Sequence, residues 1–337
     1  MTAAPLRVVS LLPSATDTVL ALDYGHVLVG RSHECDAPGL QHLPALTSSR
    51  VGNIPVDEID AVMSASAAAV RELAQLGAAL AVPLLEYGLC VYHLHLEQLQ
   101  QLRPDVVLTC LQAAHGAVLS DGLLEAALHS VLGYAPRVVH CAAERLDGVW
   151  RDMQAVADGL EVPERGRAVV EKHRQHLADV AASARGRGSL RVAAIQWPQP
   201  LMACGAWVPE MIKMAGSQDV CGAVDHAEVV SEQQLGTAAP DVVIFALCGL
   251  TLEQSLQAAR ATIRRLADTW PSLPAARAGR VAVVDGEHVF SRPGPLLSQS
   301  MEVLMELMHP EVQPYGHQGK LWRWLDGGSS DAALAPA

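Results

Sequence analysis

The chain has 337 residues, of which 50% are hydrophobic and 18% charged, so a folded globular core is expected and intrinsic disorder is not. Its formal net charge of −12 excludes a protein that binds nucleic acid without regard to sequence, because such binding needs a basic surface that releases counterions. Aromatic residues make up only 4%, which leaves the six tryptophans as a large share of the aromatic surface available to a ligand.

The N-terminal stretch MTAAPLRVVSLLPSAT passes directly into a strand-like run and lacks the basic and apolar regions of a secretory signal. The seven cysteines show no CxxC spacing, which suits a reducing compartment better than a disulfide framework. The most apolar stretch, around 59–85, is interrupted by Arg71 and Glu72 and ends near Pro83, so it does not predict a membrane span. We therefore expect a cytoplasmic protein that is not embedded in a membrane.

Short runs of apolar and β-branched residues, bounded by turn residues, recur along the whole chain. Continuous runs of this kind are typical of parallel strands that are covered on both faces. Helical segments such as 66–80 and 95–103 lie between them, and this alternation predicts the α/β fold class. The predicted strands are 6–12, 26–30, 105–110, 137–140, 190–195, 241–248 and 280–286.

Two halves of the chain resemble each other. The stretch EQLQQLRPDVVLTC at 97–110 returns as SEQQLGTAAPDVVIFALC at 231–248, and LRVVS at 6–10 returns as LRVAA at 190–194. Both pairs occur in the same order, which favours two similar α/β lobes.

A segment rich in helix formers lies between these halves. Gly159 and Pro163 divide it, and Pro163 suits the first turn of a new helix. A long spine helix is therefore expected at about 163–185. The predicted organisation is an N-terminal lobe (1–143), linker helices (144–188), a C-terminal lobe (189–312) and a tail (313–337) whose end is disordered.

No nucleotide-binding motif is present, because no GxGxxG follows the first strand and no GxxxxGK[ST] occurs. Instead LLPSATDTVLAL at 11–22 follows that strand, with Ser14 or Thr16 expected as a helix N-cap. A helix N-terminus at this point offers free backbone N–H groups to a polar or anionic ligand. An ordinary capped helix would show the same sequence.

The segment SHECD at 32–36 gathers several metal donors and catalytic groups. In an extended loop His33 and Cys35 would share one face, which suggests a nucleophile with its base. Together with Asp36 they are also metal donors, and HLH at 93–95 supplies further histidines. No GxSxG, CxxC or HExxH pattern organises these residues, so a polar ligand-binding loop is a third interpretation.

The segment IQWPQPLMACGAWVPEM at 195–211 follows the first strand of the second half. In doubly wound sheets ligands bind outside the carboxyl ends of the strands, so we expect a shaped binding loop with a turn at Gly205. Trp197 and Trp207 would supply contact area, and Met202 a flexible apolar filler. Either tryptophan could equally seal the core.

These stretches together resemble the cobalamin/iron-siderophore family of periplasmic binding proteins, the helical-backbone solute receptors of ABC importers. More narrowly, the chain is similar to the cobalamin-binding branch that lacks a signal peptide. The matching stretches span roughly residues 6–310 and are RVVSLLPSATDTVLAL, LVGRSHECDAPGLQHLPALTSSR, LRPDVVLT, WVPEMIKMAG, PDVVIFALCG and AGRVAVVDGEHVFSRPGPLLSQSMEVLMELMHP.

The resemblance implies two Rossmann-like lobes joined by one long backbone helix, with a ligand cleft between the lobes. It also implies that loops at the strand ends of both lobes hold a corrinoid or a similar large tetrapyrrole. On this sequence those loops are Leu12–Thr16, 32–36, Met202–Trp207, the region near His226 and Phe290–Arg292. The expected ligand-binding residues are Pro13, Ser14, His33, Glu34, Cys35, Tyr92, Trp197, Met202, Gly205, Trp207, His226 and Arg292.

The expected function is therefore a non-enzymatic binding protein for a corrinoid, with no intrinsic cofactor. It would act as an intracellular carrier or sensor, or as the solute receptor of an ABC importer. His33 is a candidate axial ligand to a bound corrinoid or heme, with His226 as the alternative. Family members dock on a permease through surface carboxylates, and here Lys213 stands near an expected docking position with Glu210 nearby.

Two other functions stay open. A receptor for an iron siderophore or another metal chelate would need cationic groups around an anionic ligand, and Arg31, Arg50 and Arg292 are available. An enzyme on the same scaffold would use Cys35 with His33, which requires a depressed thiol pKa.

Overall fold

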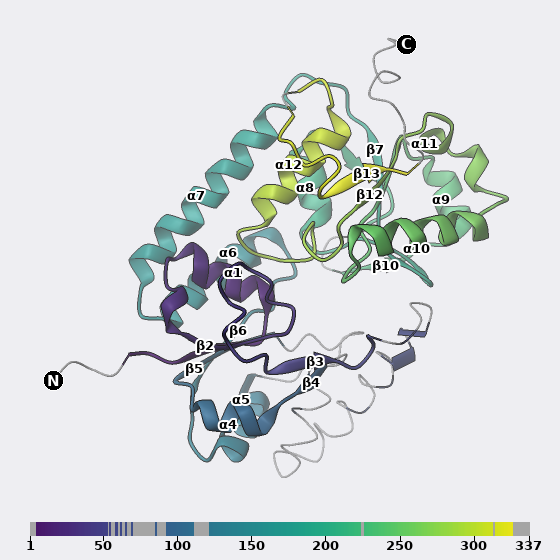
Figure 1. The fold of residues 1–337 in the computed structure, drawn as a ribbon. Coiled ribbons are helices and arrows are strands. Elements are labelled where there is room, and N and C mark those ends of the chain that lie inside the picture. The colour runs from purple at the N-terminus through teal and green to yellow at the C-terminus, as the bar shows by residue number, and fades with distance from the viewer. Residues whose placement is uncertain are drawn as a thin grey trace. The chain divides into compact units, whose positions relative to one another are not determined.

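The computed structural model describes residues 5–52, 92–110, 121–223, 226–312 and 314–325, with isolated positions between 54 and 85. Most of the helix predicted over 66–80, and the predicted disordered end of the tail, lie outside the described residues. The chain divides into two compact units, Met1–Ala142 with Gly148–Val170 and Ala143–Asp147 with Glu171–Ala337. Figure 1 shows the elements of each unit.

The first unit is built around a parallel sheet. Its elements are β1 (Val8–Ser10), α1 (Pro13–Ala21), β2 (Leu28–Arg31), β3 (Thr47–Ser49), β4 (Tyr92–Leu94), α4 (Leu96–Leu102), β5 (Val106–Thr109), α5 (Asp121–Leu132), β6 (Arg137–His140) and α6 (Leu146–Gly159). The strand order is β2-β1-β5-β6, with β3 and β4 forming a separate antiparallel pair. The strand predicted over 26–30 begins only at Leu28, because Gly25–Val27 forms a 3-10 turn.

Alternate residues of these strands belong to two separate hydrophobic cores, one on each face of the sheet. Val8 and Val106 pack with side chains of α1 and α6, whereas Val9 and Val107 pack with side chains of α4 and α5. Figure 1 accordingly shows α1 and α6 on one side of the sheet and α4 and α5 on the other. Burial on both faces explains why the strands are continuous apolar runs instead of alternating ones.

The second unit is built around a mixed sheet. Its elements are β7 (Arg191–Pro198), β8 (Leu201–Ala203), α8 (Val208–Met214), β9 (Gln218–Asp219), β10 (Glu228–Val229), α9 (Glu232–Ala238), β11 (Val242–Phe245), α10 (Leu252–Arg265), α11 (Pro274–Arg277), β12 (Val281–Val284), α12 (Leu297–Met308) and β13 (Trp322–Trp324). The order is β10-β8-β7-β11-β12-β13, and β9 also pairs with β7. The strands β7, β11 and β12 are parallel, while β8 and β13 run antiparallel to their neighbours.

The repeated Pro-Asp-Val-Val sequence has the same structural role in both units. In each, a helix ends on a left-handed residue, with φ of 44° after α4 and 41° after α9, and a proline follows because it cannot continue the helix. Asp105 then accepts the backbone N–H of Arg7, and Asp241 accepts that of Arg191, at 2.8 Å in both cases. The N–H groups of the two aspartates donate to the carbonyls of the same arginines. Each aspartate therefore fixes the start of two adjacent strands relative to each other.

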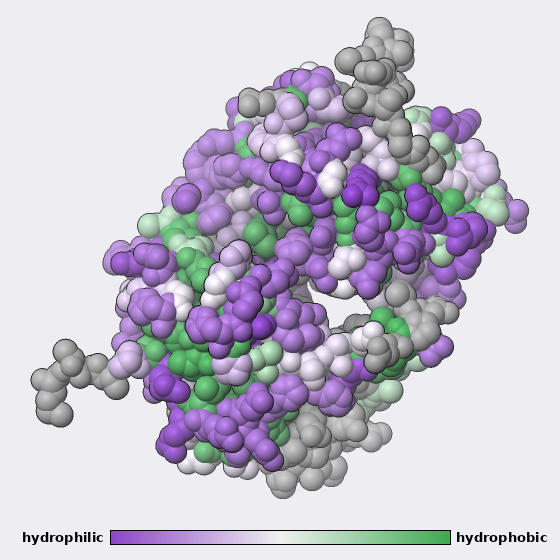
Figure 2. All heavy atoms as spheres, viewed as in Figure 1, coloured by the Kyte–Doolittle hydropathy of each residue, from purple (hydrophilic) through white to green (hydrophobic). Residues whose placement is uncertain are grey.

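α7 (Pro163–Ala182) is a helix of 20 residues that begins with a proline in its first turn. The division between the units falls within it, between Val170 and Glu171. It ends at Ala182 and not at 185, because the next N–H groups bond to carbonyls three residues back, as in a 3-10 turn. None of the helices in the described part of the chain is long and apolar enough to cross a membrane. On the face drawn in Figure 2, hydrophilic residues predominate and apolar residues form scattered patches.

Asp219 at the end of β9 places a carboxylate in a buried position. Its Oδ1 accepts the N–H groups of Cys221 at 2.9 Å and Gly222 at 2.6 Å. Its buried Oδ2 has no hydrogen-bond partner among the described residues. Burial raises the pKa of this carboxyl, and the two backbone hydrogen bonds oppose that shift only in part.

We expect Asp219→Asn to increase the free energy of unfolding at pH 7, because the amide keeps the Oδ1 acceptor and removes the buried charge. The pKa of the Asp219 carboxyl is about 3.9 in the unfolded chain and higher in the folded protein. The free energy of unfolding of the wild type therefore falls as pH rises from the first pKa to the second. The advantage of the variant should therefore shrink as pH falls from 7 to 4. Urea unfolding of both proteins at the two pH values measures this. A difference that does not change with pH would contradict the explanation.

Candidate functional site

Loops at the carboxyl ends of the strands carry most of the predicted site residues. In the first unit the SHECD segment follows β2, and the start of α1 follows β1, the neighbour of β2 in the sheet. In the second unit Trp207 lies after β8 and Arg292 after β12. The carboxyl edge of the strands is where doubly wound folds bind their ligands.

Thr47 of β3 organises the SHECD segment. Its Oγ1 lies 3.0 Å from Ser32 Oγ and 2.7 Å from Nδ1 of His33, and it accepts the His33 backbone N–H at 3.0 Å. Ser32 and Thr47 are buried, and His33 is half-buried. Burial lowers the pKa of His33, and the neighbouring Glu34 carboxylate offsets part of that shift. The imidazole is therefore held neutral near pH 7.

Tyr92 of β4 joins the same cluster from 58 residues away along the chain. Its hydroxyl donates to Glu34 Oε1 at 2.7 Å, and its ring meets that of His33 edge-on with the centroids 5.1 Å apart. Arg50 Nε donates to the Tyr92 carbonyl at 3.0 Å. Three of the predicted residues, His33, Glu34 and Tyr92, are thus brought together.

Cys35 points into the core of the first unit. It is 4% exposed and packs in the same cluster as Ala15 and Val19 of α1. Its Sγ lies 3.0 Å from Thr16 Oγ1, whereas the His33 ring bonds to a different threonine. A thiol buried among apolar side chains behaves as a small hydrophobe and not as a nucleophile.

α1 begins at Pro13 with Leu12 as its N-cap. The predicted cap at Ser14 or Thr16 is wrong, because proline occupies the first helical position and both residues lie inside the helix. Pro13 and Ser14 are buried, and Leu12 provides no side-chain cap for the first N–H groups of the helix. Water or another polar group from outside the helix can satisfy them.

The segment around Trp197, predicted as a loop, is a β-hairpin. β7 makes its last pairing with β11 at Ile195 but continues to Pro198 before the chain turns back as β8. Trp197 pairs with Met202, and Met202 pairs with Val229 of β10, so the three side chains lie in a row on one face. We call these three residues the apolar row. Val229, at 57%, is the most exposed large hydrophobic residue of the described chain.

Gly205 lets two segments of the second unit approach closely. A Cβ at this position would lie 1.9 Å from the carbonyl oxygen of His226, so only glycine fits. The structure thus places these two predicted residues together, through the His226 backbone, while His226 itself is exposed. Trp207, the N-cap residue of α8, donates its indole N–H to the Phe290 carbonyl at 2.8 Å. The half-buried Trp207 therefore ties the loop after β8 to the loop after β12.

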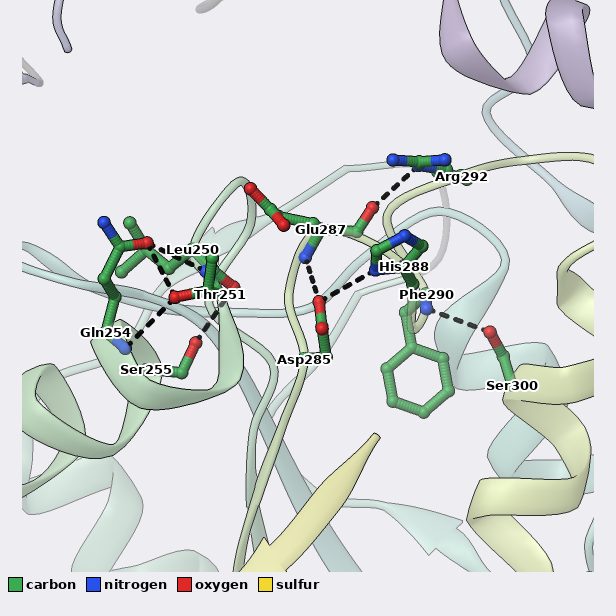
Figure 3. Close-up of polar contacts among 10 residues, drawn as sticks. All are labelled: Leu250, Thr251, Gln254, Ser255, Asp285, Glu287, His288, Phe290, Arg292 and Ser300. Atoms are coloured by element: carbon green, nitrogen blue, oxygen red, sulfur yellow. Dashed lines mark hydrogen bonds and ion pairs between the residues drawn. The ribbon is translucent and has the colours of Figure 1, made fainter. Parts of the chain in front are cut away.

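The loop after β12 is held at several points (Figure 3). Phe290 has φ 68°, a conformation that bulky residues rarely adopt. Its N–H donates to Ser300 Oγ at 3.0 Å, and its side chain is buried. Arg292 is 8% exposed, and its Nε donates to the Glu287 carbonyl at 2.9 Å.

Three metal donors converge in the same loop. Asp285, Glu287 and His288 are the only group of three or more His, Cys, Asp and Glu residues in the described chain with donor atoms within 4.8 Å of one another. Asp285 Oδ1 accepts the Glu287 N–H at 3.0 Å and lies 3.1 Å from His288 Nδ1, as Figure 3 shows. The metal donors predicted around Cys35 and Asp36 do not form such a group in the described residues.

Thr47, Asp285, Glu287 and His288 are not among the residues predicted for the site. No local sequence pattern identifies Thr47 as a partner of His33, because the two residues are 14 positions apart and lie on separate elements. The other three did have a signal. The sequence DGEH at 285–288 directly follows a buried strand, β12. SHECD was selected because it carries polar groups at the carboxyl end of such a strand, and the same criterion selects DGEH.

α8 carries the position at which a docking carboxylate was expected. Glu210 Oε1 pairs with Arg145 at 2.8 Å, and its Oε2 accepts the Leu146 N–H at 3.2 Å. Lys213, in the last turn of α8, is exposed. The carboxylate nearest to the expected docking position is therefore already paired within its own unit.

A model of the protein family described as periplasmic binding protein matches residues 8–287 of the chain. None of the curated proteins compared with the chain matches it.

Several solved structures share the fold at low sequence identity. A periplasmic heme-binding protein from Pseudomonas aeruginosa is 21% identical, covers 92% of this chain and 95% of its own, and gives a TM-score of 0.63. A periplasmic vitamin B12-binding protein of Vibrio cholerae is 17% identical, with coverages of 91% and 98% and a TM-score of 0.59. An ABC transporter substrate-binding protein from Listeria monocytogenes is 13% identical, with coverages of 91% and 100% and a TM-score of 0.63. These matches confirm the predicted α/β fold class.

Gly205→Ala should destabilise the protein by about 1–3 kcal/mol, because the new Cβ would overlap the His226 carbonyl. Gly122→Ala on α5 is the matched control. Nothing lies within 4 Å of a Cβ at Gly122, so helix propensity predicts a gain of roughly 0.5–1 kcal/mol. Urea unfolding compares the two variants with wild type. Unchanged stability in Gly205→Ala would show that the two segments separate at no cost.

Acidification should destabilise the fold partly through His33. Because burial lowers the pKa of His33 in the folded state, the unfolded chain binds the proton first as pH falls below about 6.5. Stability should decrease between pH 7 and pH 5, and the decrease should be smaller in His33→Gln, which cannot titrate. His129→Gln is the control, since His129 is exposed on α5. An equal pH dependence of urea unfolding in wild type and His33→Gln would refute this role.

Proposed function

Because the chain belongs to the periplasmic binding protein family, we propose that it binds and releases a solute without catalysing a reaction, and that the solute is a corrinoid or another ligand of tetrapyrrole size. The solved structures that share its fold include proteins described as binding heme and vitamin B12. Heme and vitamin B12 are the ligands given for those proteins. For this chain they support the proposal of a ligand of tetrapyrrole size.

The apolar row of Trp197, Met202 and Val229 carries the proposal. β7, β8 and β10 each place one apolar side chain on the same face, and the hairpin formed by β7 and β8 continues past the end of β11. Neighbouring strands lie roughly 4.8 Å apart, so the row extends over about 10 Å. Val229 is exposed, whereas Trp197 and Met202 are half-buried. A partly exposed apolar surface of this length suits a flat ring system better than a compact sugar or amino acid.

The first unit, considered by itself, places polar groups at the carboxyl ends of its strands. The neutral imidazole of His33, the Glu34–Tyr92 pair and the uncapped N-terminus of α1 offer both donors and acceptors. A corrinoid carries amide groups around its ring, and such groups both donate and accept hydrogen bonds. We therefore keep these residues in the proposed ligand-binding set.

A receptor for an anionic iron chelate is the second candidate. Such a ligand would need cations around it, yet Arg31 donates to the carbonyls of Ser32, Cys35 and Leu40 and so supports its own loop. Arg50 and Arg292 each donate Nε to a backbone carbonyl as well. These structural roles favour a ligand whose recognition does not depend on several arginines.

An enzyme that uses Cys35 with His33 is the third candidate. The burial of Cys35 and its contact with Thr16 weigh against it, because a nucleophile must reach its substrate. Alkylation with iodoacetamide tests this directly. Modification of Cys35 in the folded protein would favour the enzyme, whereas protection until unfolding would exclude it.

The proposal also includes a cytoplasmic carrier that does not depend on a permease. Glu210 is paired with Arg145, and the exposed charge beside it, Lys213, is positive. Seven cysteines without CxxC spacing suit a reducing compartment. Cell fractionation with an antibody against the protein tests the location.

Titration of the purified protein with cyanocobalamin, hemin and a ferric siderophore tests the ligand class. At a free ligand concentration of a hundred times Kd, binding should stabilise the fold by about 2.7 kcal/mol and so raise Tm. Visible absorbance reports the same event independently. Binding of the siderophore alone would favour the second candidate, and no response to cyanocobalamin or hemin would overturn the proposal.

Met202→Ala should weaken tetrapyrrole binding about tenfold or more, because it removes the central side chain of the apolar row, worth roughly 1.5–3 kcal/mol when buried. Met214→Ala is the matched control, since Met214 is 37% exposed at the end of α8 and lies outside the row. Kd values from absorbance titrations compare the two. Wild-type affinity in Met202→Ala would remove the row from the site.

A further inference from the structure

We infer that the open edge of β6, in the first unit, binds an extended segment of a partner protein, which adds to the sheet as an antiparallel strand. The segment carries a basic side chain between two apolar ones. The inference does not rest on the proposed function, because it uses none of the proposed ligand-binding residues.

β6 lies at the edge of its sheet and pairs with β5 alone among the described strands. The N–H of Arg137 donates to the Asp105 carbonyl at 2.8 Å. The N–H of Cys141 donates to the Thr109 carbonyl at 2.9 Å. Because the backbone groups of successive residues face opposite sides of a strand, the N–H and the carbonyl of Val138 point away from β5.

The opposite edge of the same sheet is covered by the chain itself. The N–H of Arg31 in β2 donates to the Pro44 carbonyl at 3.0 Å, and the Arg31 carbonyl accepts the Leu46 N–H at 2.7 Å. Proteins usually protect their edge strands, because a row of unpaired N–H and carbonyl groups invites pairing with another chain. β6 is therefore the edge at which the described sheet can still accept a strand.

The second unit shows how a strand occupies the equivalent edge. Val138 of β6 pairs with Val107 of the Pro-Asp-Val-Val sequence. Val281 of β12 pairs with Val243, the corresponding valine of the repeat, so β6 and β12 have the same register in their sheets. β12 is covered by β13, which runs antiparallel to it, and the Val281 carbonyl accepts the Leu325 N–H at 2.9 Å. Figure 1 shows β13 beside β12.

A groove follows β6 between two helices of the first unit. A depression of about 420 Å³ is lined by Val138 and Val139 of β6, by Glu125 of α5 and by Asp158 of α6. An adjoining depression of about 360 Å³ shares Glu125 and Val138 and extends along α5 to His129. Extended peptides bind to other proteins by adding a strand to an open sheet edge, where pockets beside the strand receive alternate side chains.

Both walls of the groove carry carboxylates. Glu125 on α5 is exposed, and Asp158 on α6 accepts the side-chain amide of Gln154 at 2.8 Å. Arg137, the arginine of the groove, donates Nη1 to the Gly159 carbonyl at 2.7 Å and so is bonded within its own unit. The groove therefore favours a segment with a basic side chain over an acidic one.

β13 shows which side chains a strand at this edge carries. Arg323 stands between Trp322 and Trp324, which gives an alternation of apolar, basic and apolar residues. Arg323 pairs with Glu253 of α10 at 2.8 Å. α10 lies between β11 and β12 in the sequence as α5 lies between β5 and β6, so Glu125 offers a carboxylate on the corresponding helix.

A second copy of this chain is a less favourable occupant than a basic segment. Pairing of β6 with β6 of another copy would bring two grooves lined by carboxylates together. Each chain also has a formal net charge of −12. Like charges that face each other oppose association, whereas a basic segment is attracted.

Short synthetic peptides test the inference on the full chain. The probe is acetyl-Val-Thr-Val-Arg-Val-Thr-Val-amide, which places one arginine between valines. We expect it to bind and to slow hydrogen exchange at the Val138 amide. Two further versions are N-methylated on one or the other set of alternate residues. Only the version whose methylated side faces β6 should bind about tenfold or more weakly, because only that version loses hydrogen bonds to the edge.

Three variants of the protein test the same contact. Val138→Pro removes the N–H that points away from β5, a place where proline is tolerated, and should weaken binding about tenfold or more. Glu125→Lys should weaken binding about three- to tenfold, and should bind the peptide in which glutamate replaces the arginine more tightly than wild type does. Glu97→Lys on α4 is the matched control, since Glu97 is an exposed carboxylate of the same unit. Urea unfolding verifies that each variant is folded.

Four results would overturn the inference. The first is no binding of the arginine peptide by wild type. The second is equal binding of the two N-methylated peptides, which would show that the peptide does not pair as a strand. The third is a Val138 amide that is protected from exchange in the unbound monomer, since a segment of the chain itself would then cover the edge. The fourth is a dimer in sedimentation that Val138→Pro abolishes, which would make a second copy the occupant.

Discussion

The hydrogen bonds of Asp105 and Asp241 fix where the central strands of each sheet begin relative to each other. Each carboxylate accepts the N–H of a residue at the start of the adjacent strand, Arg7 just before β1 or Arg191 in β7, and each aspartate N–H donates back to the carbonyl of the same residue. Hydrogen bonds to an ionised group are roughly twice as strong as neutral ones. β1, β5 and β11 are only three or four residues long, so a fixed start also fixes where their carboxyl ends lie. The positions of the loops that carry the candidate site therefore depend on contacts at the opposite edge of each sheet.

The elements that could be predicted from sequence are those with uniform surroundings. The strands at 105–110 and 241–248 are buried on both faces, and continuous apolar runs suffice to find them. Proline in the first turn likewise marks the start of α7. The hairpin around Trp197 could not be predicted, because its prolines resemble a loop signal. Pro198 instead ends β7 beyond the last pairing with β11, where the loss of one N–H is tolerated.

The candidate site could be predicted only as a set of loops. Its side-chain partners lie far apart in sequence, such as Tyr92 with Glu34 and Thr47 with His33. The alternation that placed His33 and Cys35 on one face assumes an extended segment. The segment turns instead, with the Cys35 N–H donating to the Ser32 carbonyl at 3.2 Å, and this turn sends the thiol into the core. The alternation of residue types along the sequence does not reveal a turn that redirects one side chain in this way.

The contacts of Gly205 with His226 and of Gly286 with Leu247 join backbone to backbone. They make no use of the side chains that flank them. A directed library could therefore randomise Glu287 and neighbouring loop positions while both glycines are kept. Selection from it could change the solute that is recognised without changing how the chain folds. In this respect the two backbone contacts hold the loops of the candidate site in place whatever side chains the loops carry.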